Sequence, residues 1–329
     1  MEAPLLLAVD GNSLLHRAYH AHEESGHRTG DGRPCWAING LWSQLLAAVN
    51  RVDPAGVLLA FDDPAANERK VVHPAYKAHR ADKPADLVAQ LASAPDHLAR
   101  SGLTVRVEPG TEADDVLASA AAQAEAAGWR CVLATSDRDS FALITEQTSV
   151  LRIINGGVPN SPLLNPAKLR ILTHGIGPEQ YRAYAALRGD SSDNLPGVPG
   201  IGPKTALRLL TAFPTISAAL AEHDAGGPGL VAAVGGAAAA RLASAQAREI
   251  LTTNLALMTM RTDVRLPDLD EMRIPIPPGD LLAELEEWNL PGIRNQARWL
   301  LTDPATYRPS VARARPVVAQ AYEQPSLFD

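Results

Sequence analysis

Three carboxylate side chains gather in the short stretch PGTEADDV, which covers residues 109–116. Glu112, Asp114 and Asp115 fall within four positions there, with no lysine or arginine among them. A helix start explains part of this pattern, because Thr111 is a suitable N-cap and acidic residues in a first turn interact favourably with the helix dipole. A helix start does not need three carboxylates, so the other acidic residues of the chain decide how the stretch is interpreted.

The elements that must position these acids are predicted to be strands and helices in alternation. Apolar runs separated by helical patterns are typical of a mainly parallel sheet with helices on both faces. The predicted strands cover residues 5–9, 56–61, 104–107, 131–135 and 149–154. The predicted helices between them cover residues 41–50, 85–100, interrupted at Pro95, and 113–128. The first half of the chain is therefore predicted to be an α/β domain.

Seven carboxylates come directly after these strands, and they are Asp10, Asp62, Glu112, Asp114, Asp115, Asp137 and Asp139. The carboxyl ends of parallel strands share one edge of a sheet, where ligands of such folds bind, so we expect the seven to converge. Converging like charges are costly unless a cation lies among them. Oxygen ligands without nearby cysteine or paired histidine favour Mg²⁺ or Mn²⁺. Two such ions about 3.5–4 Å apart commonly stabilise the attacking and leaving oxygens when a phosphodiester is cut by in-line attack. Each acidic pair alone is also compatible with a helix cap or a solvated loop, but their shared position favours a metal site.

The second half of the chain is predicted to be helical, with patterns over residues 166–175, 178–189, 202–213, 240–258 and 281–289. A Gly/Ala-rich stretch at 224–240 is predicted to be a loose loop that enters a helix. The stretch RGDSSDNLPGVPGIGPKTALRLL, at 188–210, adds Asp190 and Asp193 as further acids for the same edge.

The glycine-rich part of that stretch is a candidate phosphate-binding turn, because its backbone N–H groups can face an anion. A Walker loop is the competing interpretation, and it fails because Pro203 separates Gly202 from Lys204. A helix–hairpin–helix that grips the backbone of a duplex fits better. The DNA contacts predicted there are Gly197, Gly200, Gly202, Lys204 and Thr205.

A basic run, ERKVVHPAYKAHRADKP at 68–84, follows Asp62 and surrounds Tyr76 with cations. These cations are Arg69, Lys70, Lys77, Arg80 and Lys83. Cations around an aromatic ring suit a single strand, with phosphates on the charges and a base on the ring. A solvated face is the commoner explanation of such a run. Its place beside the expected metals favours nucleic-acid contact here.

The composition limits the class of protein without naming a function. The chain has 329 residues, of which 46% are hydrophobic and 20% charged, as in an ordinary globular protein of about two domains. Two cysteines exclude a disulfide framework and favour the cytoplasm, and the start MEAPLLLAVDG is neither a signal peptide nor a membrane anchor. A net charge of −7 argues mildly against nucleic acid unless the acids chelate cations.

Five stretches together resemble the flap endonuclease family, and most closely the 5′-nuclease domain with which bacterial DNA polymerase I begins. They are VDGNSLLHRAYHA (9–21), FDDPAANERKVVHPAYKAHR (61–80), PGTEADDVLASAA (109–121), LATSDRDSFALI (133–144) and GDSSDNLPGVPGIGPKTA (189–206). They cover the first two thirds of the chain in the family's order and spacing. Departures at Thr111, Glu68 and Asn39 lie in regions that pack against substrate, and they leave substrate preference open.

The resemblance implies a role for each acidic residue. The first metal would be held by Asp10, Asp62, Glu112 and Asp114. The second metal would be held by Asp137, Asp139 and Asp193, with Asp115 and Asp190 supporting through water. The fold that it implies is a PIN-like parallel sheet with a helical arch at about 66–90, followed by a helical domain with an H2TH-type helix–hairpin–helix at about 188–210.

The resemblance also implies where the DNA lies. Arg69, Lys77 and Arg80 would line the arch, which admits a 5′ single strand, and Arg17 would contact a phosphate near the metals. The hairpin around Gly200 would hold the downstream duplex, often with a bound K⁺ in this family. A zinc site at His16 and His20 is the alternative for the histidine-rich stretch, but no HExxH glutamate or third ligand follows.

We therefore predict a free-standing, structure-specific 5′-3′ exonuclease and flap endonuclease that uses Mg²⁺ or Mn²⁺ in replication and repair. Its nuclease domain would cover 1–165, its helical DNA-binding domain 166–301 and a flexible tail 302–329. Lys77 and Arg80 would offset charge in the transition state, while Asp10, Asp62, Asp114 and Asp137 act through the metals. We expect a cytoplasmic, nucleoid-associated monomer that does not bind a membrane. The rival functions are a PIN-type ribonuclease and a non-catalytic protein that binds DNA junctions.

The last residues, QPSLFD, resemble the short peptide by which bacterial replication proteins dock on the sliding clamp. Gln324, Leu327 and Phe328 are the residues that would contact the clamp. Short motifs of this kind also arise by chance, so the clamp is a hypothesis to be tested by deleting the peptide.

Overall fold

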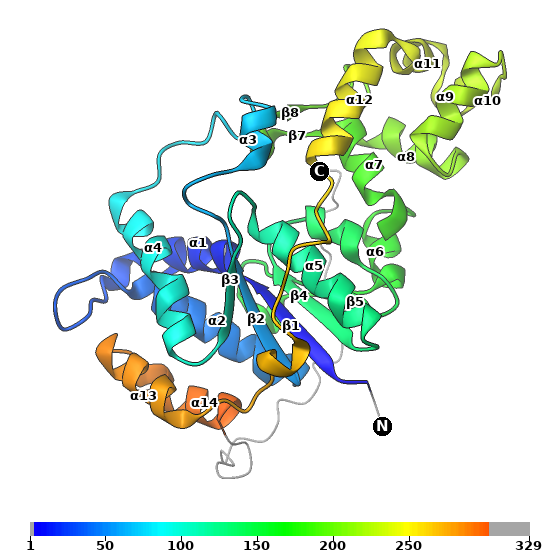
Figure 1. The fold of residues 1–329 in the computed structure, drawn as a ribbon. Coiled ribbons are helices and arrows are strands. Elements are labelled where there is room, and N and C mark those ends of the chain that lie inside the picture. The colour runs from blue at the N-terminus through cyan, green and yellow to red at the C-terminus, as the bar shows by residue number, and fades with distance from the viewer. Residues whose placement is uncertain (1–2, 303–329) are drawn as a thin grey trace.

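The computed structural model describes residues 3–302, and a six-stranded sheet lies at its centre (Figure 1). The strands are β1 (Leu5–Asp10), β2 (Gly56–Phe61), β3 (Thr104–Val107), β4 (Arg130–Thr135), β5 (Thr148–Arg152) and β6 (Leu163–Leu164). Their order is β3-β2-β1-β4-β5-β6, and the first five strands are mutually parallel while β6 runs antiparallel to β5. The α/β fold and the parallel sheet predicted from the sequence are confirmed.

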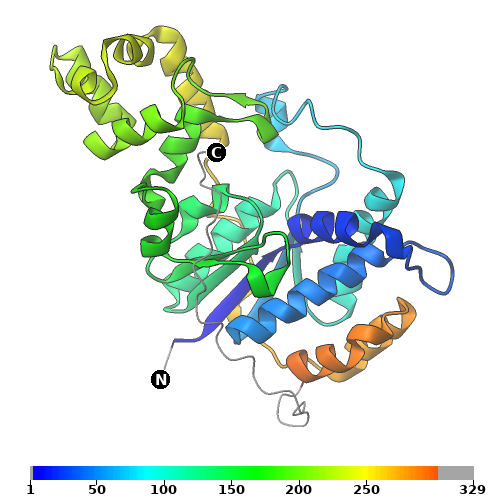
Figure 2. The ribbon, with the colours of Figure 1, turned by 180° about the vertical axis from the view of Figure 1, so that it is seen from behind.

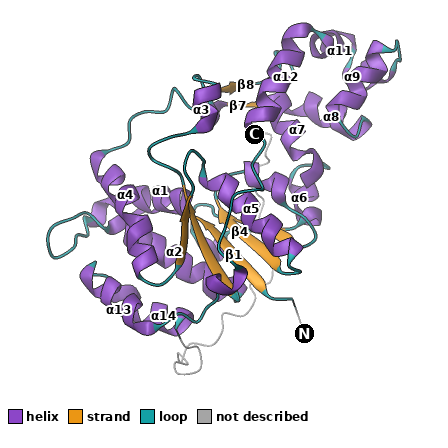
Figure 3. Ribbon diagram, viewed as in Figure 1, coloured by secondary structure: helices purple, strands orange, loops and turns teal. Residues whose placement is uncertain are grey.

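Alternate residues of β1 face opposite sides of the sheet, and each side has its own hydrophobic core. Leu7 packs with α1 (Gly11–His22), α2 (Trp36–Val52) and α4 (Ala85–Arg100), whereas Leu6 packs with α5 (Ala113–Ala126). Figure 3 shows the strands in orange between these helices. Burial on both faces explains why the strands read as continuous apolar runs rather than as alternating patterns.

The second half of the described chain is mainly helical. Its elements are α6 (Pro166–Leu172), α7 (Pro178–Arg188), β7 (Gly189–Asp190), β8 (Leu195–Pro196), α8 (Pro203–Ala212), α9 (Ile216–Asp224), α10 (Gly229–Val234), α11 (Gly236–Ala243), α12 (Ala245–Leu257), α13 (Pro278–Glu287) and α14 (Pro291–Leu301). Helices α7 to α12 gather beyond the carboxyl edge of the sheet, whereas α13 and α14 return to pack on α4 and α2 (Figures 1 and 2). Five short 3-10 helices complete the described chain, at Glu23–Ser25, Asp139–Leu143, Val158–Asn160, Ser191–Asp193 and Leu269–Met272.

The basic run after β2 contains one short helix, α3 (Glu68–Val72), and then an irregular segment up to α4. This arch segment, residues 66–84, lies beside the hairpin of β7 and β8 in both ribbon views (Figures 1 and 2). The Lys77 backbone N–H donates to the Asp193 carbonyl at 2.9 Å, and Asn194 Nδ2 donates to the Ala75 carbonyl at 2.7 Å. The two halves of the chain therefore meet over the carboxyl edge of the sheet.

Two local predictions are wrong. Helix α4 continues through Pro95, because buried Leu87, Ala94 and Leu98 anchor the helix on both sides of the position at which proline removes a hydrogen bond. The Gly/Ala-rich stretch 224–240 is not a loose loop but contains α10 and the start of α11. Alanine has the highest helix propensity, and burial of Leu230 in the core fixes the first of these helices.

No helix within residues 3–302 is long and apolar enough to span a bilayer. The predicted tail lies outside the described residues, except for Thr302, and the clamp peptide at 324–329 lies wholly outside them.

Candidate metal centre and nucleic-acid cleft

The ends of three neighbouring strands place acidic side chains at one edge of the sheet. Asp10 ends β1 and caps α1, where its carboxylate accepts from the Ser13 N–H at 2.8 Å. Asp62 follows β2, and it accepts from the Ala113 N–H at the start of α5 at 2.9 Å. The acids that line a single cleft of about 1250 Å³ are Asp10, Asp62, Asp114, Asp137 and Asp190.

The protein balances the negative charge of this edge only in part. Burial, together with the charges of Asp62 and Asp137, raises the pKa of Asp10 to about 7. Burial and the neighbouring carboxylates raise the pKa of Asp139 to about 8 and that of Asp114 well above its usual value. The Asp114 Oδ1 atom is buried and has no hydrogen-bond partner. A set of oxygen donors with an orphaned atom and excess negative charge fits a divalent cation.

Glu112 and Asp193, two of the proposed ligands, are instead held by the arch segment. Lys77 Nζ donates to Glu112 Oε1 at 2.5 Å, and Arg80 Nη2 donates to Asp193 Oδ1 at 2.8 Å. Although burial alone raises the pKa of Glu112, the Lys77 ammonium holds it below its usual value. In the described part of the chain, no three histidine, cysteine or acidic side chains are close enough together to hold an ion as they stand. Glu112 and Asp193 are paired with Lys77 and Arg80 instead.

Tyr76, which the sequence suggested as a base-stacking ring, is buried. Its side chain is only 3% exposed, and its hydroxyl lies 3.0 Å from both Glu112 Oε2 and Asp193 Oδ2. The Lys77 ammonium lies 4.7 Å from the centre of the same ring. The sequence could not show this orientation, because it depends on how the arch segment folds back on the two carboxylates.

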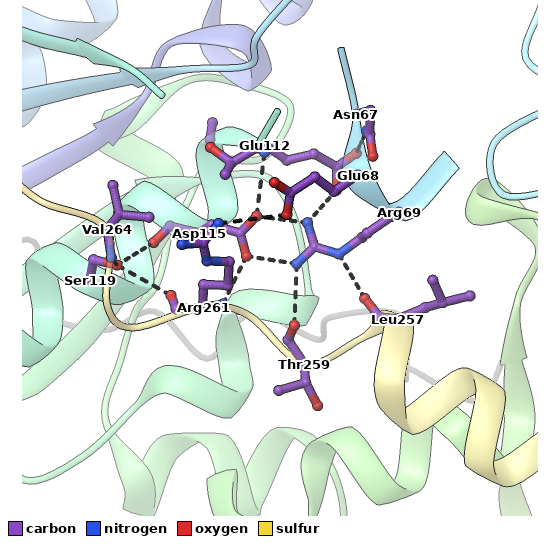
Figure 4. A network of polar contacts seen from close by, with 12 residues as sticks. Asn67, Glu68, Arg69, Glu112, Asp115, Ser119, Leu257, Thr259, Arg261 and Val264 are labelled. Carbon is purple, nitrogen blue, oxygen red and sulfur yellow. Dashed lines mark hydrogen bonds and ion pairs between the residues drawn. The ribbon is translucent and has the colours of Figure 1, made fainter. Parts of the chain in front are cut away.

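The side chains of Arg69 and Asp115 face each other next to Glu112 (Figure 4). Their side chains form an ion pair at 2.7 Å, and Asp115 is 1% exposed. Neither residue is among those that line the cleft. Both were predicted to act on substrate or metal, as a DNA contact and a water-mediated ligand.

The remaining predicted cations have different degrees of access to the cleft. Arg17 lines it and donates to Asn155 Oδ1 at 3.0 Å, while Lys77, Arg80 and Lys83 line the arch side. Lys70 is exposed on α3. The cleft thus has acids on its sheet side and cations on its arch side.

Several cleft residues are absent from the sequence-based predictions, namely Asn12, Ser13, Ser136, Arg138 and Arg188. Asn12 Nδ2 donates to Asp62 Oδ2 at 2.8 Å, and the Ser13 and Ser136 hydroxyls are 2.5 Å apart. A usable signal existed for Arg138, because it stands between two predicted ligands in SDRD. His16 also lines the cleft, where burial lowers its pKa to about 4.

The predicted hairpin is a tight turn whose glycines have different functions. A Cβ on Gly197 would lie 2.1 Å from the Arg188 carbonyl oxygen, so this glycine permits close packing of two backbones. Gly200 has a φ of +75°, and the Arg241 guanidinium lies against it. Gly202 caps α8, with open space where a side chain would be. Lys204, in the first turn of that helix, is exposed and Thr205 is half-buried.

Comparisons with known proteins agree with this architecture. A family model described as the 5′-3′ exonuclease N-terminal resolvase-like domain matches residues 5–169, and the 5′-3′ exonuclease C-terminal SAM fold matches residues 176–278. DNA polymerase I of Mycobacterium bovis is 35% identical over 249 residues, which cover 76% of this chain and 27% of the polymerase. Thermostable DNA polymerase I of Thermus thermophilus is 34% identical over 328 residues, which cover 96% of this chain and 37% of the polymerase. The chain thus spans between about a quarter and two fifths of the length of these relatives.

Solved structures share the fold at lower identity. The T5 5′-exonuclease with bound zinc superposes with a TM-score of 0.61 at 17% identity, covering 91% of this chain and 94% of the other. The catalytic core of Rad2 in complex with DNA substrate gives a TM-score of 0.54 at 15% identity, with coverages of 91% and 92%. The resemblance found in the sequence is confirmed by the family models, and the chain belongs to the 5′-3′ exonuclease family.

Proposed function

We propose that this protein is a divalent-metal-dependent 5′ nuclease that cuts DNA at 5′ flaps and 5′ ends. The observation that supports this most strongly is a single cleft with incompletely compensated carboxylates on its sheet side and cations on its arch side. A phosphodiester needs both, because metal ions are held by the carboxylates while the anionic substrate is attracted to the cations.

The carboxylates that would hold the ions are those of Asp10, Asp62, Asp114 and Asp137, with Asp139 and Asp190 close by. When bound, two such ions supply an activated water and neutralise the attacking and leaving oxygens of an in-line displacement. Glu112 and Asp193 are proposed to join as ligands when Lys77 and Arg80 turn toward a phosphate.

Lys77 and Arg80 are proposed to position the scissile phosphate. Both line the cleft, and both now donate to carboxylates, which a phosphate can replace as a charged acceptor of similar geometry. Arg17 lines the same cleft and suits a neighbouring phosphate. The arch segment would then lie over a 5′ single strand, with Lys70 and Lys83 as exposed contacts.

The helical half is proposed to hold the downstream duplex through its phosphates. Gly202 caps α8 and has open space around it, and Lys204 in the first turn exposes its ammonium, an arrangement that suits a phosphate without reading a base. Mg²⁺ or Mn²⁺ at the cleft and K⁺ at the hairpin are the ions that we propose. The division into domains at 1–165 and 166–301 stays a proposal, as do the cytoplasmic, nucleoid-associated location and the monomeric state.

A labelled 5′-flap duplex, with Mg²⁺ and with EDTA, tests the proposed function. We expect the wild type to cut near the base of the flap only with Mg²⁺, and Asp137→Ala to lose this cutting. Asp270→Ala is the matched control, because Asp270 is exposed and pairs with Arg273 far from the cleft. Cutting of RNA but not of flapped DNA would indicate a PIN-type ribonuclease. Tight binding without cutting under any divalent ion would indicate a junction-binding protein.

The sliding clamp is a proposed partner through Gln324, Leu327 and Phe328, which lie outside the described residues. Deletion of residues 324–329 should abolish binding to a bacterial clamp and leave cleavage of free oligonucleotides unchanged. Clamp binding that survives the deletion would exclude this peptide as the docking site.

A further inference from the structure

Arg69 uses every hydrogen-bond donor that its side chain has (Figure 4). A guanidinium carries five N–H groups. Its Nε donates to the Leu257 carbonyl at 2.9 Å, and its two Nη atoms donate to the Thr259 carbonyl at 3.2 Å, to Glu112 at 3.2 Å and to Asp115 at 2.7 and 2.8 Å. Five bonds fill five donors, so no donor remains for a phosphate.

Asp115 is filled in the same way. A carboxylate has about four lone-pair sites. Oδ1 accepts from Arg69 Nη2 at 2.7 Å and from the Arg261 N–H at 2.8 Å, and Oδ2 accepts from Arg69 Nη1 at 2.8 Å and from the Glu112 N–H at 3.3 Å. With four bonds made and 1% of the residue exposed, Asp115 has no oxygen free for a metal or its water.

The contacts of this pair connect three segments that are distant in the sequence. Arg69 lies in α3 of the arch segment, Asp115 lies in the first turn of α5, and the accepting carbonyls belong to residues 257–259, where α12 ends. Ser119 adds a second tie, because its hydroxyl donates to the Asp115 carbonyl at 2.8 Å and accepts from the Val264 N–H at 3.0 Å. The arch segment, the metal edge and the helical half therefore meet at one point.

We infer that Arg69 and Asp115 form a joint that positions Glu112 and fixes the arch segment relative to the helical half, and that neither residue binds DNA or metal. Glu112 is the residue through which the joint acts, because Arg69 donates to its carboxylate and Asp115 accepts from its N–H. This inference rests on the proposed nuclease function. It makes Arg69 and Asp115 positioning residues rather than ligands of substrate or metal.

The salt dependence of DNA binding separates a joint from a phosphate contact. Loss of one phosphate contact lowers the slope of log affinity against log salt by about one. We expect Arg69→Ala to bind a flap duplex in EDTA with the slope of the wild type. Lys70→Ala is the matched control, because Lys70 is the next residue on α3 and is exposed, and its slope should fall by about one. A reduced slope for Arg69→Ala would overturn the inference.

Turnover tests whether the two residues act as one unit. We expect kcat to fall about 10- to 100-fold in Arg69→Ala or Asp115→Ala with KM for DNA unchanged, as for groups that orient a ligand. The double variant should lose no more than the worse single variant, because the joint is already broken. Multiplied losses in the double variant would show two independent roles and would contradict the joint.

Arg69→Lys decides the case if the alanine variants do not fold. A lysine serves a phosphate well but cannot bridge two carboxylates and two carbonyls as the planar fork of an arginine does. We therefore expect Arg69→Lys to lose kcat nearly as far as alanine would, whereas an Arg69→Lys enzyme with wild-type kcat would refute the joint. If the wild type binds flap DNA without cutting it, the proposed function fails, while the salt slopes still test the joint.

Discussion

The acidic edge of the sheet and the polar cluster around His97 both bury ionisable side chains, but only the cluster supplies all its own partners. In the cluster, Trp42 Nε1 donates to His97 Nε2 at 2.8 Å. Because a tryptophan N–H only donates, His97 carries its proton on Nδ1, which lies 2.9 Å from Glu284 Oε2. Arg100 completes the cluster by donating to Glu284 Oε1 at 2.6 Å.

At the acidic edge the hydrogen-bond partners are incomplete, although Asp10 accepts from Ser13 and Asp62 from Asn12. Asp114 Oδ1 is buried without a hydrogen bond, and burial among other carboxylates raises the pKa of Asp10 and Asp114. The His97 cluster joins α4 to α13 and has no access to the cleft, so its polar groups are explained by packing alone. The difference teaches that buried charged groups without enough partners in the protein indicate a functional site. Their charge is stabilised only when an ion or a ligand binds there.

The largest expected effect comes from removing charge at the acidic edge. We expect Asp114→Asn to lower kcat for flap cutting about 1000-fold, because a group that acts on the reacting phosphate through a metal is lost. The same change should raise the melting temperature in EDTA. The pKa of Asp114 is higher in the folded protein than in the unfolded chain, so its ionisation destabilises the fold as pH rises through the folded pKa. An asparagine does not ionise and therefore avoids this loss of stability.

Kinetics and thermal melts of the same preparation measure both effects, with Asp270→Asn as the exposed control. If Asp114→Asn melted at a lower temperature and cut as well as the wild type, Asp114 would be a structural residue and the comparison would fail.

The sequence was informative at this edge because the rule involved is local. Asp10, Asp62 and Asp137 each follow an apolar run, and parallel strands bring such positions to one edge whatever the details of packing. The partners of Asp115 could not be found in this way. Its carboxylate accepts from the backbone N–H of Arg261, which is 146 residues away. Every residue type except proline has such an N–H group, so the sequence cannot indicate which one binds.

The His97 cluster shows the same limit from the structural side. His97 and Glu284 are 187 residues apart, and each occurs in an ordinary amphipathic helix. Only the packing of α13 against α4 makes them partners. Tyr76 is a third case, since its sequence neighbours suggested a base-stacking ring, whereas the fold of the arch segment buries it against Glu112.

The second prediction concerns the pH dependence of stability at the complete cluster. Burial lowers the pKa of His97 to about 4, from an unfolded value of about 6.5. A histidine that stays neutral when folded contributes stability fully above pH 6.5, and this contribution is lost as pH falls toward 4. The loss is about 3 kcal/mol in all, of which about 2 kcal/mol should be gone by pH 5.

Urea unfolding at several pH values measures this loss, and His97→Gln is the matched variant because glutamine keeps a donor and an acceptor without titrating. We expect its free energy of unfolding to change less between pH 7 and pH 5 than that of the wild type. An identical pH dependence in both proteins would assign the effect to other groups, such as Glu284.

The smallest expected effect sharpens the comparison by testing both regions in one experiment. At a Mg²⁺ concentration of about 100 times its Kd, the free energy of unfolding should rise by about 2.7 kcal/mol, because the ion binds only the folded acids. Protons compete for Asp10, with a pKa of about 7, and for Asp139, with a pKa of about 8, so the gain should be small at pH 6 and full above pH 8. Glu284→Ala should be less stable than the wild type yet keep the whole gain, whereas Asp114→Asn should lose it. If the gain in the free energy of unfolding were independent of pH, or persisted in Asp114→Asn, the ion would bind elsewhere. The acidic edge and the His97 cluster would then no longer differ in the way proposed here.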